Sequence, residues 1–316
     1  MNKLLPLVLL VLFPLSAHGD CSFTFSGDKM FLDEDCTTET SIVVPHGMTL
    51  DCAYNTITAV DPPGGSFLGA VVRNGGAEAH VTQCIVTTFN LKNGCKAGDD
   101  RLRGIMLEGA SGSVTDNFVQ NINKGASGCQ EGNAIEIRNA PFDGTHPATK
   151  NVSVLSNQVS AWQKTGILAN GDLKVTIRGN TVTPSATQAN LAANGIQMAY
   201  GAAGTIENNN VGGNSWCCTD YVATAVLLID TAPSIVRNNI MNAGNADVGF
   251  YIYSNNVTVE NNKAFESGPD GTYDIGFGYW GNNIKAKNNK ARGFDISFSP
   301  EKGIKDKTLP QPQINN

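Results

Sequence analysis

One short phrase recurs between Gly166 and Ala291 and limits the folds open to this chain. Its copies are VTIRGNTV (175–182), GTIENNNV (204–211), SIVRNNIM (234–241), VTVENNKA (257–264) and IKAKNNKA (284–291). Each copy alternates small or β-branched residues with polar ones and has an Asn at the sixth place, and these Asn are 29, 30, 23 and 27 residues apart. Self-similarity at a period of about 20–50 residues is the signature of a repeat architecture.

A companion phrase precedes each copy, as GILA (166), GIQM (195), AVLL (225), GFYI (249) and GFGY (276). In a strand, alternate side chains point to opposite faces, so the second and fourth residues of this phrase, Ile and Leu in its GI-x-L form, would share one face. A single turn of about 25 residues cannot bury that face alone, whereas turns stacked about 4.8 Å apart form a continuous core of parallel strands. The pattern therefore predicts an all-β solenoid.

The sixth-place Asn extends the pattern towards the N-terminus, where Asn55, Asn117 and Asn157 occupy the same place and Cys84 replaces the Asn in one turn. We expect each Asn to lie at a bend between strands, because Asn tolerates left-handed backbone geometry. Its amide can also bond the identical amide one turn away. These Asn are accordingly predicted to be structural.

Composition narrows the partners and the compartment. The net charge is −6 and the pI about 5.2, which disfavours nucleic acid because phosphate binding needs a concentrated basic face. Residues 1–19 have the pattern of a secretory signal, with Lys3 ahead of a short apolar run, and no other long apolar segment follows. We expect residues 20–47 to form an N-terminal cap, 48–298 the solenoid and 299–316 a loose tail. The predicted product is secreted or periplasmic, without a transmembrane segment.

Eight cysteines follow the predicted signal, and an even number in an exported chain favours disulfides over metal ligation. The period suggests the pairs Cys21–Cys36, Cys52–Cys84 and Cys95–Cys129, since the last two are 32 and 34 residues apart, about one turn. Cys217 and Cys218 would form a vicinal ring. Free or separately paired thiols are the alternative.

The pattern resembles the right-handed parallel β-helix proteins of the pectate-lyase-like superfamily over about residues 21–298. The opening FLDEDCTTETSIVVPHGMTLDCAYNTI (31–57) is similar to that superfamily's cap and first turn. The resemblance implies a right-handed, single-stranded parallel β-helix of about nine to ten turns. It also implies carbohydrate as the partner, since most members act on carbohydrates. The sharper signatures of its enzyme families are missing; Gly98-Asp99-Asp100, for example, is not followed one turn later by Gly-His-Gly.

Substrate in this superfamily lies across the outward side of the companion strands and the loops that enter them, so polar and aromatic residues there are the candidates. A lyase or epimerase acting on a uronate needs a group that neutralises the sugar carboxylate, a base and an acid. Arg103, Lys164, Tyr251 and Glu136 are the predicted catalytic residues. The predicted substrate-binding residues are Arg101, Arg138, Gln197, Tyr221, Tyr253 and Trp280.

Other functions compete with this hypothesis. Outward charges on a solenoid are ordinarily a solvated face, and Arg101 and Arg103 could simply pair with Asp99 and Asp100. Clustered Asp and Glu could hold Ca²⁺, although no metal site is predicted with defined ligands. The leading hypothesis is a polysaccharide lyase or uronate epimerase-like enzyme, and the alternative is a non-catalytic glycan-binding or envelope protein.

Overall fold

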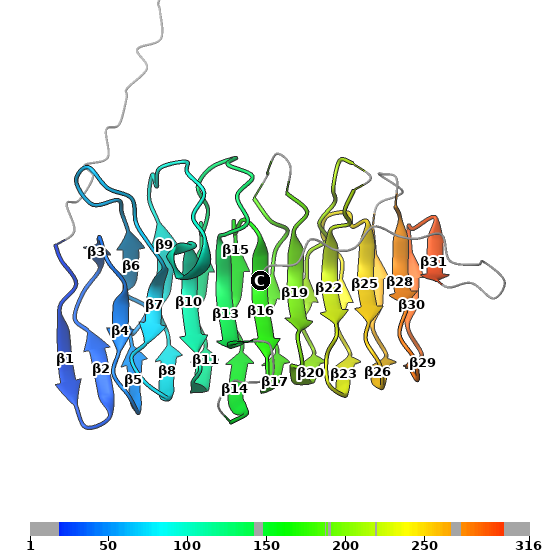
Figure 1. Cartoon of the computed structure of the whole chain (residues 1–316), viewed down its shortest axis with the longest axis horizontal. Helices are drawn as coiled ribbons and strands as arrows, with labels where there is room; N and C mark the ends of the chain where they lie inside the picture. Colours follow the sequence, from blue (N-terminus) through cyan, green and yellow to red (C-terminus); the bar gives the residue numbers. More distant parts are fainter. Residues whose placement is uncertain are drawn as a thin grey trace, which may run out of the picture.

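The computed structural model describes residues 19–141, 148–186, 188, 191–218, 220–266 and 273–299. The predicted signal segment (except its last residue, Gly19) and the predicted tail beyond Ser299 lie outside these residues. The described chain winds into an elongated solenoid in which strands of successive turns lie side by side (Figure 1). Each turn contributes one strand to each of three sheets, so the predicted all-β parallel solenoid is confirmed.

Sheet 1 has ten strands. They are β4 (Ile42–Val44), β7 (Ala70–Asn74), β10 (Arg103–Glu108), β13 (Asn133–Asn139), β16 (Thr165–Gly171), β19 (Asn194–Ala199), β22 (Thr224–Ile229), β25 (Val248–Tyr253), β28 (Ile275–Tyr279) and β31 (Ile296–Ser299). A short 3₁₀ turn, η1 (Gly98–Asp100), precedes β10. The companion phrase of the sequence supplies five of these strands, β16 to β28.

Sheets 2 and 3 are built from the repeated phrase and its earlier counterparts. Sheet 2 contains β1 (Phe23–Ser26), β2 (Lys29–Leu32), β5 (Met48–Asp51), β8 (Glu78–Thr82), β11 (Ser111–Thr115), β14 (Lys150–Leu155), β17 (Leu173–Arg178), β20 (Ala203–Glu207), β23 (Ser234–Arg237), β26 (Val257–Glu260) and β29 (Lys285–Lys287). Sheet 3 contains β3 (Cys36–Thr38), β6 (Thr56–Ala59), β9 (Ile85–Thr88), β12 (Phe118–Gln120), β15 (Gln158–Ser160), β18 (Thr181–Val182), β21 (Asn210–Val211), β24 (Ile240–Met241), β27 (Lys263–Phe265) and β30 (Lys290–Arg292).

The parallel pairing begins before residue 48, where the solenoid was expected to start. Strands β2, β3 and β4 already form one turn and pair in parallel with β5, β6 and β7. Within the described residues, only β1 pairs antiparallel, on the free edge of β2. The cap-like opening of the sequence is therefore mostly the first turn, closed by one reversed strand.

The core lies inside the solenoid and is stacked in register. On sheet 1 the inward column is Val72, Ile105, Ile135, Ile167, Ile196, Val226, Phe250 and Phe277, all fully buried. Phe250 and Phe277 stack with ring centroids 4.7 Å apart, and Phe298 continues the stack at 5.4 Å. Like side chains on adjacent turns give the dense packing that alternating patterns predict.

The predicted Asn ladder exists between sheets 2 and 3. The side-chain amides of Asn117, Asn157, Asn180, Asn209, Asn239, Asn262 and Asn289 form one row, each Nδ2 donating to the next Oδ1 over 2.9–3.1 Å. The backbone N–H of Cys84 donates to Asn117, so Cys84 does occupy the Asn place. One detail of the prediction is wrong: the left-handed residue is not the ladder Asn but the residue before it, such as Asn208 at φ 56°. Turning the chain one residue earlier leaves the ladder Asn to point inwards, where its amide is buried.

All four predicted disulfides are present, as Cys21–Cys36, Cys52–Cys84, Cys95–Cys129 and Cys217–Cys218. The second and third join adjacent turns, as their spacing suggested. The alternative of free thiols is excluded, because the structure has no free cysteine.

Candidate functional site

The side of sheet 1 that faces away from the core, here called the outer face, carries most of the predicted site residues. Parallel register places Met106, Glu136, Leu168, Gln197, Leu227 and Tyr251 in one outward column. Arg138 and Tyr253 belong to the next column, two residues further along their strands. The distances between the predicted residues can therefore be judged from their strands and columns on the outer face.

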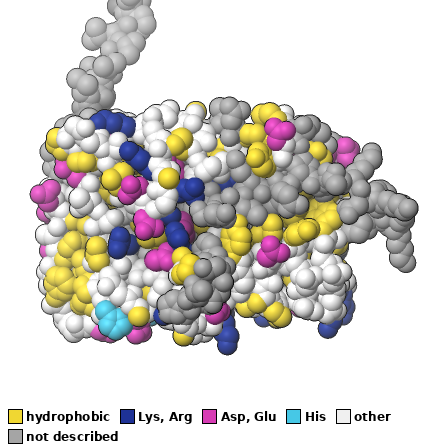
Figure 2. Space-filling model, viewed as in Figure 1, with side chains coloured by type: hydrophobic (Ala, Val, Ile, Leu, Met, Phe, Trp, Pro, Cys, Tyr) yellow, Lys and Arg dark blue, Asp and Glu magenta, His cyan; other side chains and the backbone are white. Residues whose placement is uncertain are grey.

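Charged side chains gather over β10 and β13, on the left of the view in Figure 2. Arg103 Nε donates to Glu136 Oε2 over 2.7 Å, and both side chains are almost fully buried. Arg138 lies between two carboxylates, 2.5 Å from Glu108 Oε2 and 3.7 Å from Glu136 Oε1. We call Arg101, Arg103, Glu108, Glu136 and Arg138 the charged cluster.

Burial and neighbouring charges set the protonation behaviour of this cluster. Burial raises the pKa of Glu108 above its usual value, and the positive charge of Arg138 offsets part of that rise. Burial and the adjacent Arg103 lower the pKa of Arg101 from its usual value, which still leaves a guanidinium charged at neutral pH. Glu108 was not among the predicted residues. Its signal was its place directly opposite Arg138 in the parallel register, which the sequence alone does not align.

Lys164 lies immediately before β16, and its side chain is fully buried. Its ammonium donates to the carbonyl oxygen of Ala192 on the next turn. Burial lowers the pKa of Lys164 to about 7, because a desolvated ammonium loses its proton more readily. Of the predicted catalytic residues, Lys164 is the one with the pKa that a base working near neutrality requires.

A row of buried amides and hydroxyls follows on the next turns of the outer face. Gln197 Nε2 donates to Asn170 over 3.3 Å, Asn194 donates to Gln197 over 3.3 Å, and Thr224 donates to Asn194 over 2.9 Å. Gln197, a predicted substrate-binding residue, is thus part of an internal network in this structure. Its amide orientation is set by two neighbours, Asn170 and Asn194.

Beyond this row the outer face becomes apolar. Ala199, Val222, Leu227, Ile229, Val248, Tyr251 and Ile275 form a second hydrophobic cluster, separate from the inner core, and Trp280 packs against it. Figure 2 shows hydrophobic side chains over these later strands, to the right of the charged cluster. Tyr251 stacks at an angle on Trp280, with ring centroids 4.5 Å apart, and burial raises the pKa of its hydroxyl.

A hollow opens at the edge of this apolar region, where the chain leaves sheet 1. It has a volume of about 320 Å³ and is lined by Asp230, Thr231, Tyr253, Ser254, Asn255, Trp280, Gly281 and Asn282. We call it the aromatic hollow. It brings together two predicted substrate-binding residues, Tyr253 and Trp280, with polar residues that the sequence did not single out, Asp230 foremost. These residues come from three successive turns, so they meet only when the turns are stacked.

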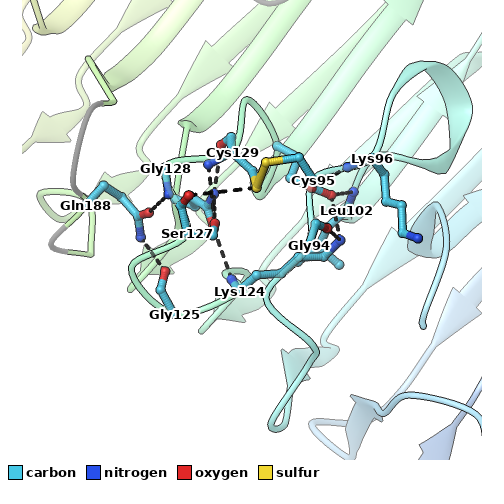
Figure 3. The surroundings of a disulfide bond; sticks show 12 residues. Gly94, Cys95, Lys96, Leu102, Lys124, Gly125, Ser127, Gly128, Cys129 and Gln188 are labelled. Atoms are coloured by element: carbon cyan, nitrogen blue, oxygen red, sulfur yellow. Dashed lines mark hydrogen bonds and ion pairs between the residues drawn. A yellow bond between two sulfur atoms is a disulfide. The ribbon is translucent and has the colours of Figure 1, made fainter. Parts of the chain in front are cut away.

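The loops that lead into the strands of sheet 1 are fixed to one another near the charged cluster. Cys95 and Cys129 join two of them, and Lys124 Nζ lies 3.0 Å from Glu131 Oε2 with both side chains fully buried. Glu131 also accepts the backbone N–H groups of Lys96 and Leu102. Gln188, from a third loop, bonds the backbone of Gly125 and Gly128 (Figure 3). The result is a rigid wall beside β10 and β13.

The structure brings some predicted residues together and separates others. Arg101, Arg103, Glu136 and Arg138 lie within one cluster, and Lys164 lies on the following turn. Tyr251 is four strands from Glu136, about 19 Å at the usual strand spacing. Tyr221 lies on a different loop, where its ring meets Trp216 edge-on beside the Cys217–Cys218 bond. The proposed catalytic set therefore does not surround a single sugar residue.

Two other expectations concern metals and membranes. Among the described residues, no group of three or more His, Cys, Asp or Glu side chains is arranged to hold a metal ion. The same part of the chain has no helix of the length and apolarity needed to cross a bilayer.

Comparisons with known proteins agree with this architecture. A family model described as "Right handed beta helix region" matches residues 144–304, about half of the chain. The crystal structure of Dettilon tailspike protein (gp208) is similar with a TM-score of 0.50 and 13% sequence identity, over 83% of this chain and 55% of that one. The chain thus spans about half the length of that tailspike. No curated protein matches the sequence. On the evidence of its sheets, its ladder and the family match, this chain belongs to the right-handed beta helix family.

Proposed function

We propose that the protein binds a glycan along the outer face of sheet 1 and anchors it in the aromatic hollow. The observation that supports this most is the lining of that hollow, which combines two aromatic rings with hydroxyl, amide and carboxylate groups. Binding sites for small polar ligands typically pair an apolar surface with a few placed hydrogen-bonding groups. Sugars have both kinds of surface, since their C–H faces pack on rings while their hydroxyls bond to polar groups. The superfamily resemblance of the sequence also implies carbohydrate.

The charged cluster is better suited to binding a glycan than to catalysis. A uronate lyase needs cations free to neutralise the substrate carboxylate, whereas Arg103 is already paired with Glu136 in a buried contact. Arg138 is likewise flanked by Glu108 and Glu136. Tyr251 is too distant from this cluster to act as acid on the same sugar. These groups support a fixed surface for recognition.

The test titrates the full chain with a panel of neutral, amino and uronate oligosaccharides and measures binding by calorimetry. We expect binding of at least one class, weakened about tenfold or more by Trp280→Ala or Tyr253→Ala, because central aromatic residues usually dominate binding. Phe25→Ala is the control, since Phe25 is also an exposed aromatic residue but lies at the opposite end of the solenoid. No binding across the panel, or unchanged binding by both variants, would refute the proposal.

A second candidate function is a polysaccharide lyase or uronate epimerase in which Lys164 is the base. Its support is the pKa of about 7 that burial gives Lys164. Incubation with uronate polymers, with and without Ca²⁺, should then produce unsaturated ends that absorb in the ultraviolet or epimerised residues visible by NMR. The rate should rise with pH to a plateau above about 7, and Lys164→Met should abolish it. A panel without either product would eliminate this candidate and leave glycan binding in place.

The four disulfides support export, because such bonds are typical of oxidising compartments. A secreted or periplasmic location is accordingly part of the proposal.

A further inference from the structure

The geometry of the aromatic hollow points to a substrate class: we infer that it selects a sugar bearing a protonated amine over neutral sugars and uronates. This inference rests on the proposed glycan binding and concerns the same site. It differs from the uronate specificity expected from the sequence. Its basis is the charge and the rigidity of the residues that line the hollow.

The lining of the hollow carries negative charge and no positive charge. Of the eight residues around the hollow, Asp230 is the one with an ionisable charge at neutral pH, and none is Lys, Arg or His. Asp230 is exposed, and its carboxylate forms no ion pair with another residue in the described part of the chain. A uronate carboxylate placed here would meet a like charge without a cation to neutralise it. An ammonium group would meet an unpaired carboxylate.

The backbone holds Asp230 at a fixed corner. Its N–H donates to the carbonyl oxygen of Tyr253 over 3.1 Å, and its own carbonyl oxygen accepts from Gly201 over 2.8 Å. Its φ of 49° lies in the left-handed region, which Asp tolerates better than most residues. The backbone from which the carboxylate extends is therefore fixed at the rim, and less entropy is lost there when a ligand binds.

Trp280 is also held in place. A methyl group at Gly278 would collide with its indole ring, so the ring lies directly over the backbone of β28. The ring of Tyr251 packs against the indole at a centroid distance of 4.5 Å. A cation near the face of Trp or Tyr gains an additional attraction, which is greatest for Trp. Asp230, Trp280 and Tyr253 thus supply the two contacts that an ammonium group prefers, a carboxylate and an aromatic ring.

The remaining polar groups are organised to bond hydroxyls. Ser254 Oγ accepts the N–H of Thr231 over 3.0 Å, and Asn255 Oδ1 accepts the N–H of Asn282 over 2.7 Å. These bonds fix the orientation of Ser254 and Asn255 while the Asn255 NH₂ group keeps its donors for a ligand. The volume of about 320 Å³ is at the lower end of the usual range for small-molecule pockets, about 300–1,000 Å³. A single sugar ring is the unit that this space and this chemistry suit.

The experiment compares three probes of equal length on the full chain: tetramers of glucosamine, N-acetylglucosamine and galacturonic acid, titrated by calorimetry at pH 6. The glucosamine tetramer should bind about tenfold to a hundredfold more tightly than its N-acetylated form, as expected for a hydrogen bond to a charged partner. The galacturonate tetramer should bind most weakly. Asp230→Asn should remove the preference for the amine and leave the affinity for the N-acetylated tetramer within about twofold.

Asp116→Asn is the matched control, because Asp116 is also exposed and also has a left-handed backbone, at φ 56°, but lies at the corner between sheets 2 and 3. It should leave all three affinities unchanged. Asn is tolerated in this backbone region, so neither variant should disturb folding.

The outcomes separate the two proposals. If tetramers bind through Trp280 but the amine is not preferred, or if Asp230→Asn leaves the preference intact, the amine specificity is wrong and glycan binding stands. If the galacturonate tetramer binds most tightly, the specificity is again wrong. If none of the three probes nor any other glycan of the panel binds, both proposals are wrong.

Discussion

The outer face of sheet 1 contains two regions that share a backbone and differ in chemistry. Over β10 and β13 the outward side chains are charged and neutralise one another, as in the 2.7 Å contact of Arg103 with Glu136. Over β22, β25 and β28 they are apolar and aromatic, and Tyr251 packs on Trp280. In both regions the inward side chains are aliphatic or aromatic and belong to one core. The repeat thus determines the inside of the solenoid and leaves the outside of each turn to vary.

The difference shows how each region is stabilised and what each can bind. A buried ion pair is a poor source of stability but is costly to break, because the partner left behind is an uncompensated charge. An aromatic ring that is partly exposed beside such a cluster, as Tyr253 is, can pack against a ligand. We therefore expect the first region to be sensitive to single substitutions and the second to be sensitive to ligands. Four substitutions test this expectation.

The largest effect is expected for Arg103→Met. It leaves the buried Glu136 with only the more distant Arg138, 3.7 Å away, and removes the hydrogen bonds from Arg103 to the carbonyl oxygens of Gly98, Asp99 and Arg101. The free energy of unfolding should fall by about 3–5 kcal/mol, measured by urea denaturation. Adding Glu136→Met should restore a substantial part of the loss. A single variant that costs less than about 1 kcal/mol would show that the pair is not desolvated.

Lys164, between the two regions, should give the next largest effect, and it should depend on pH. Its folded pKa of about 7 lies below the 10.5 of the free side chain, so between these values the folded state binds fewer protons than the unfolded state. Stability then rises with pH through this window, and the cost of burying the ammonium is complete below pH 7. Lys164→Met should stabilise the protein by about 1–4 kcal/mol at pH 6 and by little at pH 10.

Urea denaturation at the two pH values checks this prediction. Lys174→Met, at an exposed lysine of β17, should show no such dependence and serves as the control. A gain for Lys164→Met that is equal at both pH values would contradict the lowered pKa.

In the aromatic region, Gly278→Ala should displace the indole of Trp280, because the new methyl group would occupy the same space. We expect a loss of about 1–3 kcal/mol in stability, a change in near-ultraviolet circular dichroism and loss of glycan binding in the aromatic hollow. Gly94→Ala is the control, since its methyl group would meet no atom within 4 Å. Unchanged glycan binding by Gly278→Ala would argue against a role for the Trp280 ring.

The smallest effect is expected for Glu108→Gln, which breaks the contact with Arg138 at the rim of the charged cluster. The Glu108 side chain is 36% exposed, so solvent screens the pair and its loss should cost under about 1 kcal/mol. The cost should shrink further in high salt, measured by urea denaturation at two ionic strengths. A loss as large as that of Arg103→Met would mean that the whole cluster is one cooperative unit.

The sequence predicts the inside of this molecule better than the outside for a physical reason. The ladder Asn, the inward aliphatic residues and the pairs Cys52–Cys84 and Cys95–Cys129 each depend on one neighbour a single period away, so the period alone places them. Glu136 and Tyr251 are on the outward side, as the alternation predicts, yet both are buried. Burial there depends on loops and side chains from several turns, which no period specifies. Asp230 was missed for the same reason, since it contributes to the hollow only after three turns are stacked.

The Asn ladder has a further consequence for how such a chain can change. Successive ladder residues are 40, 23, 29, 30, 23 and 27 positions apart, yet every amide meets its neighbour in the same way. The length of a loop is therefore uncoupled from the alignment of the turns. Insertions and deletions outside the ladder strands should be inherited, or engineered, without a shift in register. Loops around sheet 1 that are not joined to their neighbours, unlike those linked by Cys95–Cys129, can then be exchanged one at a time to give new binding surfaces.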